Sequence, residues 1–257
     1  MIAPAALAAA VLVLLAAGIW QISASWRDAS RGLLIFASNQ KDLIIDTDLV
    51  ERSYTIKNDP MSVKLLRRQT VMVATSMGSH RVYMGAGVIV SDRGGLLTIL
   101  TAKHLVAHAG RHLVIFDQRL GRYARRVQLS PSEDLATVQV RAIPGISYAV
   151  ARLAPSELRS GQSFTVMGHP GSREWYPSPG IAERHRSMTL LFCPTCDRGD
   201  SGAGAFTAAG RLDGIVVKKA RIAIPSFGHN HGAVIIAFEI ERLDMIRQFL
   251  RAQRLST

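Results

Sequence analysis

The 257-residue sequence is poor in cysteine, with only two, and aromatic residues make up just 6% of it. Two cysteines cannot form the disulfide framework on which a small secreted domain depends. The chain also has no internal repeat, and no low-complexity segment apart from an alanine-rich N-terminal stretch. Hydrophobic residues form 48% of the sequence, enough for a sizeable core. The sequence therefore predicts a globular body and excludes a repeat architecture or a disulfide scaffold.

Acidic residues are also scarce, with 19 Asp and Glu against 31 Lys and Arg, which gives a net charge of +12. Such a balance favours contact with acidic surfaces such as nucleic acid, anionic lipid or acidic substrates, but it does not determine a fold. The basic residues are scattered, and no basic run is interleaved with aromatic residues. We interpret them as a solvated surface and predict no specific nucleic-acid partner.

Charge is absent altogether from residues 2–19. Eighteen helical residues just span a hydrocarbon core of about 30 Å, and Trp20 and Trp26 flank the far end as interfacial residues do. A signal peptide normally has a basic stretch before its apolar region, and none is present here. We therefore predict that residues 1–24 form an N-terminal transmembrane helix rather than a removed signal. Residues 25–65 are interpreted as a tether that adds a strand or a short helix to the body.

The strongest chemical signal is the motif Gly199-Asp200-Ser201-Gly202, which places one hydroxyl group between two glycines. At such a turn a serine Oγ can stand clear of the chain, and backbone N–H groups can approach an oxyanion. A serine is a poor nucleophile unless a base takes its proton and a third group orients that base. The motif is therefore informative only if the chain also supplies a histidine and an acid.

Both are present, each next to an apolar segment typical of a strand. Residues 97–103 lead into His104, and Asp134 stands at the head of the alternating segment 135–140. Taken singly, these residues have simpler interpretations as a turn, a packed histidine and a cap. Their occurrence together, in the order His104, Asp134, Ser201, favours a catalytic site.

These segments read Thr-Ala-Lys-His104, Asp134-Leu-Ala and Gly-Asp-Ser201-Gly. They resemble the three signatures of chymotrypsin-like (trypsin-fold) serine proteases, in the order of that family and closest to its compact bacterial members. The resemblance implies an all-β fold of two six-stranded antiparallel β-barrels. The first barrel would span residues 66–152 and the second residues 153–257, which end in a C-terminal helix.

The resemblance also implies a function, hydrolysis of peptide bonds in a protein or peptide substrate by a serine endopeptidase. Ser201 would be the nucleophile, His104 the base and Asp134 the residue that orients His104. The backbone N–H groups of Gly199 and Ser201 would form the oxyanion hole. No metal or organic cofactor is required.

A substrate pocket is implied only by position in the family, with its base at Thr195 and Cys196 and a wall along residues 217–219. Thr195 is not an acid, so the preference of trypsin for Lys or Arg is not supported. The loop that carries His231 converges on the same place in relatives. The predicted pocket residues are Thr195, Cys196, Val217, Lys218, Lys219 and His231.

The two cysteines of the motif Cys193-Pro-Thr-Cys196 allow three interpretations. We favour two free thiols. One alternative is a disulfide that stiffens this loop. A weaker one is a zinc site made with His229 and His231, motivated only by ligand type and spacing.

Three features depart from the family pattern, of which Ala203, in place of a common glycine after Ser-Gly, is a mild one. Lys103 stands where a small residue usually precedes the histidine, so its ammonium group must extend to solvent or find a partner. No N-terminus of the zymogen type precedes the first strand, although Asp200, which would pair with such an amine, is present. Asp200 must therefore find another partner or contact water.

Two rival interpretations remain for the function, a catalytically inactive protease fold that serves as a binding module and a virus-type protease that processes a polyprotein. Lys103 is the best support for the inactive module. For localisation, we predict a membrane-anchored protein whose catalytic domain is periplasmic or otherwise extracytoplasmic, as the family resemblance implies. Arg27 and Arg31 oppose this orientation, because basic residues beside a membrane segment favour the cytoplasmic side.

Overall fold

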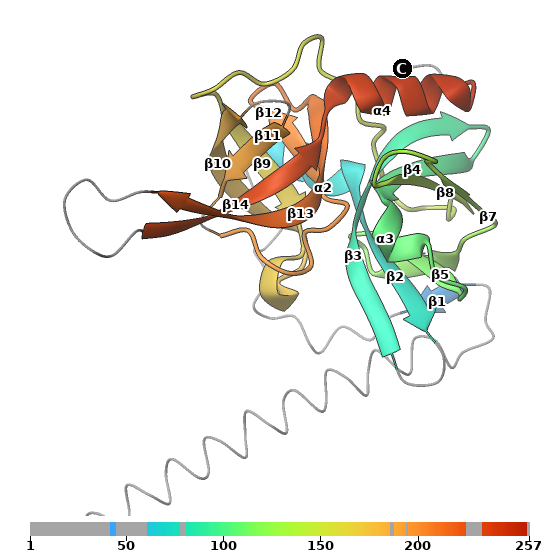
Figure 1. The fold of residues 1–257 in the computed structure, drawn as a ribbon. Helices are drawn as coiled ribbons and strands as arrows, with labels where there is room; N and C mark the ends of the chain where they lie inside the picture. The colour runs from blue at the N-terminus through green and yellow to red at the C-terminus, as the bar shows by residue number, and fades with distance from the viewer. Residues whose placement is uncertain are drawn as a thin grey trace, which may run out of the picture. The chain divides into compact units, whose positions relative to one another are not determined.

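The structure is a computed structural model that describes residues 42–44, 61–77, 81–185, 188–193, 195–224 and 233–255. Within these residues, no helix is long and apolar enough to cross a membrane. The predicted membrane segment, residues 2–19, lies outside them, as do His229 and His231. The described chain forms an all-β structure with a C-terminal helix (Figure 1).

The N-terminal half forms one antiparallel sheet of eight strands in the order β1-β6-β5-β2-β3-β4-β8-β7. Short apolar segments separated by turns produce these strands, as the sequence pattern indicates. The strands are β1 (Asp42–Ile44), β2 (Thr70–Met77), β3 (Arg81–Arg93), β4 (Leu96–Ala102), β5 (His112–Ile115), β6 (Leu120–Tyr123), β7 (Arg126–Leu129) and β8 (Leu135–Arg141).

The prediction of a closed six-stranded first barrel is wrong, because this sheet is open and resembles a half-barrel. Closure would need β6 to pair with β7. Instead, the outer edge of β6 pairs with β1, with Leu43 opposite Gly121. The edge that would close the barrel is thereby occupied by a strand from the predicted tether.

The core of this sheet is built from its central strands. Leu97 and Ile99 of β4 alternate along the strand and are fully buried with Val73 of β2 and Val138 of β8. Each such side chain contributes roughly 1.5 to 3 kcal/mol of burial free energy. This packing anchors the C-terminal end of β4, where His104 follows.

The C-terminal half forms a closed barrel of six antiparallel strands in the order β10-β11-β14-β13-β12-β9, as predicted. Closure follows because β9 pairs with both β10 and β12. The strands are β9 (Ser163–Gly168), β10 (Tyr176–His185), β11 (Met188–Phe192), β12 (Gly204–Thr207), β13 (Leu212–Ile224) and β14 (Ala233–Glu241).

Three α-helices and one 3-10 turn complete the described elements. They are α2 (Met61–Gln69), α3 (Lys103–Val106), η2 (Pro170–Ser172) and α4 (Leu243–Ala252). The predicted closing helix is confirmed as α4, which follows directly after β14. Its buried face consists of Leu243, Ile246, Phe249 and Leu250.

The two halves meet where the nucleophile motif contacts β3. The N–H of Ala86 donates to the carbonyl of Ser201 at 2.7 Å. Gly202 has a φ of +80°, and a Cβ there would lie 2.0 Å from the carbonyl oxygen of Ala86. Only glycine allows this close approach of the two backbones. The contact places Ser201, from the second barrel, against the first sheet.

Candidate active site

His104 and Asp134 are brought together by the pairing of β4 with β8. Ala102, the last residue of β4, lies opposite Leu135, the first residue of β8. His104, just after β4, is therefore close to Asp134, just before β8. His104 Nδ1 lies 2.7 Å from Asp134 Oδ2, and the backbone N–H of His104 donates to Oδ1 at 2.9 Å. Both carboxylate oxygens therefore bind the same histidine and hold its ring in one orientation.

Asp134 is kept ionised by this arrangement. Burial by itself would raise the pKa of Asp134, but the hydrogen bonds from the ring and backbone of His104 outweigh it. With the charges of His104 and Lys103, they hold the pKa of Asp134 below its usual range. The site therefore has a negative charge behind the histidine at neutral pH.

Lys103 does not disturb the site. Its side chain turns to the loop before Asp134, where Nζ donates to the carbonyl of Ser130 at 3.0 Å. Its backbone N–H donates to the carbonyl of Asp134 at 3.0 Å. The residue that departs from the family pattern thus has a partner and helps to fix the position of the acid.

Ser201 lies at a turn between β11 and β12 and is half-buried. The turn is held by hydrogen bonds from Gly202 N–H to the carbonyl of Val216 and from Ala203 N–H to that of Asp200. Neither Ser201 Oγ nor His104 Nε2 is hydrogen bonded to a residue that the structure describes. In enzymes without substrate, the hydrogen bond between a nucleophile and its base is often long, and it tightens when substrate binds.

The backbone N–H groups of Gly199 and Ser201 have no hydrogen-bond acceptor among the described residues. Gly199 has a φ of +102°, and a Cβ there would lie 2.2 Å from the carbonyl oxygen of His169. This conformation and this contact require glycine. The turn therefore presents two free donors next to Ser201.

Asp200 is fully buried, so it does not contact solvent, and its partner is the backbone of its own loop. Its Oδ2 accepts the N–H of Asp197 at 3.0 Å. Burial raises the pKa of Asp200 to about 7, although the N–H groups of Asp197 and His169 oppose this shift. Its carboxyl group is so close to the chain that a Cβ on Gly168 would lie 2.2 Å from Oδ1. Asp200 is therefore a packed carboxyl group whose ionised form is disfavoured by burial.

One contact to this site has no signal in the sequence. Glu241, at the end of β14, accepts the N–H of Asp134 through Oε1 at 2.9 Å. The two residues are 107 positions apart. No local motif joins them, so only the folded structure can identify the contact.

Residues 85–215 match the family of the trypsin-like peptidase domain, which covers half of the chain. The chain belongs to this family. The prediction of a chymotrypsin-like serine protease is confirmed, and the protein is a serine endopeptidase by family. No curated protein gives a significant sequence match.

Solved structures show the same fold. The Rv3671c protease of M. tuberculosis H37Rv, in an inactive mutant form, has 17% identity over 81% of this chain and 98% of its own, with a TM-score of 0.57. A second inactive structure of Rv3671c has 16% identity over 74% and 91%, with a TM-score of 0.55. The HtrA-type protease AlgW, in complex with a tripeptide, has 21% identity over 77% of this chain and 63% of its own, with a TM-score of 0.57.

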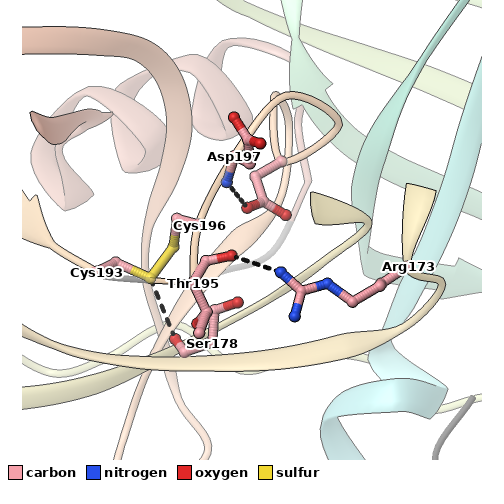
Figure 2. Close-up of a disulfide and its surroundings, with 7 residues drawn as sticks. Arg173, Ser178, Cys193, Thr195, Cys196 and Asp197 are labelled. Carbon is pink, nitrogen blue, oxygen red and sulfur yellow. Dashed lines mark hydrogen bonds between the residues drawn. A yellow bond between two sulfur atoms is a disulfide. The ribbon is translucent and has the colours of Figure 1, made fainter. Parts of the chain in front are cut away.

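A disulfide joins Cys193 and Cys196 of this trypsin-like peptidase, so the interpretation as two free thiols is wrong. The zinc interpretation is overturned as well, because disulfide sulfurs cannot act as thiolate ligands. Figure 2 shows the bond in the loop that leads to the nucleophile, beside Ser178, whose carbonyl contacts the sulfur of Cys193. Both cysteines are buried in the core of the second barrel. The disulfide anchors the loop on the side that faces this core.

The other side of the same loop is held by polar contacts (Figure 2). Arg173 donates to the carbonyl of Thr195 at 3.4 Å and packs over the ring of Tyr176. Lys219 Nζ lies 3.3 Å from Asp197 Oδ1. Thr195 thus lies next to the disulfide, and Lys219 contacts the same loop at Asp197.

Of the remaining predicted pocket residues, Val217 and Lys218 precede Lys219 on β13, and His231 lies outside the described residues. Val217 packs against the core of the first sheet, and Lys218 is exposed. A cavity of about 420 Å³ is found elsewhere, and no predicted pocket residue lines it. Its lining consists of Leu153, Ala154, Pro155, Ala209, Arg211 and Arg247.

Proposed function

We propose that this peptidase cleaves peptide bonds through His104, Asp134 and Ser201. Ser201 Oγ attacks the substrate carbonyl while His104 Nε2 takes its proton. The protonated histidine then gives this proton to the leaving amine, and the acyl-enzyme forms as the C–N bond breaks. A water molecule, activated by the same histidine, then hydrolyses the acyl-enzyme. The observation that carries this proposal is the 2.7 Å contact between His104 and Asp134, beside a serine turn attached to the same sheet.

The free N–H groups of Gly199 and Ser201 support an oxyanion hole in this mechanism. During attack the carbonyl oxygen becomes negatively charged, and donors already directed at that position stabilise it without reorganisation. Each such donor is worth about 3 kcal/mol of transition-state stabilisation in related chemistry. For the substrate pocket, we assign the base to Thr195 and Cys196 and the wall to residues 217–219.

The test is covalent labelling with a fluorophosphonate probe, followed by mass spectrometry of the labelled peptide. We expect the label on Ser201, and we expect it to disappear in the Ser201→Ala and His104→Ala variants. Ser156→Ala is the matched control, because Ser156 is exposed and no hydrogen bond joins it to a residue that the structure describes. Folded wild-type protein that takes no label would contradict the proposal and favour a binding module.

The proposed function includes a membrane tether at residues 2–19, with the catalytic domain on the periplasmic or extracytoplasmic side. The uncharged length of this segment supports the tether, and the family resemblance supports the side. The full chain is expected to sediment with membranes through an alkaline carbonate wash, whereas a chain that starts at residue 25 is expected in the supernatant. Digestion of the catalytic domain by a protease added to spheroplasts tests the side. Full-length protein released by carbonate would rule out the anchor.

A further inference from the structure

Glu241 links the second barrel to the acid of the proposed triad. It is the last residue of β14, and its carboxylate accepts the backbone N–H of Asp134 in the first sheet at 2.9 Å. Hydrogen bonds to a carboxylate are about twice as strong as those between neutral groups. No other contact in the described chain occupies this N–H, so the bond satisfies a donor that would otherwise be unpaired.

With this bond, the N–H, the carbonyl and both carboxylate oxygens of Asp134 all have hydrogen-bond partners. The carbonyl of Asp134 accepts the N–H of Lys103, and its two carboxylate oxygens bind His104. All of these partners belong to the first sheet and its helix α3. Among the residues that the structure describes, only Glu241 holds Asp134 from the barrel that also carries Ser201.

The location of Glu241 is unfavourable for a carboxylate. Burial raises the pKa of Glu241, the hydrogen bond from Asp134 opposes this, and the nearby charges of Glu133, Asp134 and Glu239 raise it further. Partial burial and three neighbouring carboxyl groups thus disfavour the ionised form of Glu241, while the N–H of Asp134 favours it. The 2.9 Å hydrogen bond to Asp134 is therefore the observation that favours a role for Glu241 in the site.

We propose that Glu241 is a positioning residue, which sets the direction of the Asp134 side chain toward His104 by holding the peptide bond between Glu133 and Asp134. Through this contact the barrel that carries the nucleophile aligns the acid-histidine pair in the neighbouring sheet. The proposal rests on the proposed function of Asp134. It predicts that loss of the acceptor slows the chemical step without weakening the binding of a substrate or probe.

The test compares Glu241→Leu, which removes the acceptor, with Glu241→Gln, whose amide carbonyl accepts the same N–H. For reaction of Ser201 with a fluorophosphonate, kinact of the Leu variant is expected to fall about tenfold or more. Its KI is expected to stay within about twofold of wild type. The Gln variant is expected to keep kinact within about threefold of wild type, since it retains the hydrogen bond.

Glu239→Leu and Glu239→Gln are the matched controls. Glu239 lies two residues earlier on β14 and is half-buried like Glu241, but no hydrogen bond joins it to Asp134. Both controls are expected to react as wild type does. A purely structural role for Glu241 would instead lower the melting temperature of Glu241→Gln, which we expect to be unchanged or higher.

A second readout does not depend on activity. In ¹⁵N-labelled protein, the amide proton of Asp134 is expected to move upfield in Glu241→Leu and to move less in Glu241→Gln, whose neutral carbonyl is a weaker acceptor. The proposal is overturned if kinact of the Leu variant equals that of wild type, if Gln fails to restore it, or if the amide resonance does not move. If wild type itself takes no label, the proposed function fails, and the resonance still decides whether Glu241 holds Asp134.

Discussion

Replacement of Asp134 by Asn is expected to lower the rate of peptide hydrolysis about 10⁴-fold while the protein remains folded. Asp134 Oδ2 accepts from His104 Nδ1, and this bond leaves Nε2 unprotonated and able to take the proton of Ser201. An asparagine that turns its NH₂ group to Nδ1 stabilises the opposite tautomer, in which Nε2 already carries a proton. The negative charge that stabilises the protonated histidine during attack is lost as well.

The measurement is cleavage of a fluorophore-labelled denatured protein, with circular dichroism to confirm folding. Asp92→Asn is a suitable control, because Asp92 caps the turn between β3 and β4 through the N–H of Gly95, at the far end of β4 from His104. It is expected to leave the rate unchanged. A rate for Asp134→Asn within about tenfold of wild type would show that Asp134 does not orient the base.

Replacement of Asp200 by Asn is expected to stabilise the protein increasingly as the pH rises. Burial raises the pKa of Asp200 to about 7, against 3.8 for an unperturbed aspartate. The protonated form therefore stabilises the folded state fully below about pH 4, and this contribution is lost as the pH rises to about 7. Asparagine does not ionise, so the variant keeps the stabilisation of the folded state that the wild type loses as the pH rises.

The difference in unfolding free energy between Asp200→Asn and wild type is expected to grow by on the order of 3 kcal/mol between pH 4 and pH 8. Urea denaturation at several pH values measures it, and the slope with pH separates ionisation from any change in packing. Asp244→Asn is the control. Burial raises the pKa of Asp244, but hydrogen bonds from Arg242 and the Met245 N–H and the charge of Arg242 together lower it. Its effect on stability therefore has the opposite sign and falls below about pH 4. A pH-independent difference for Asp200→Asn would show that Asp200 is ionised throughout this range.

The sequence alone was sufficient to identify the family, the second barrel, the closing helix and the three candidate catalytic residues. Each of these is encoded by neighbours in the chain. The glycines around Ser201 determine a turn, and the apolar alternation of residues 135–140 determines a strand. The order of His104, Asp134 and Ser201 then identifies the family.

The sequence could not predict the open edge of the first sheet, where β1 occupies the position that closure would need. Nor could it choose between two thiols and a disulfide, because the spacing of Cys193 and Cys196 is compatible with both. That choice depended on where the loop between β11 and β12 lies, with both sulfurs buried in the barrel core.

Tertiary structure alone decided how the site is supported. Lys103 binds Ser130, Asp200 is enclosed in the core beside the nucleophile, and Glu241 holds Asp134 from 107 residues away. The physical reason is that local sequence determines which strands and turns form, whereas the register and packing of those strands determine which distant side chains meet. The three proposed catalytic residues therefore follow from short motifs, while the contacts that align them follow only from the fold.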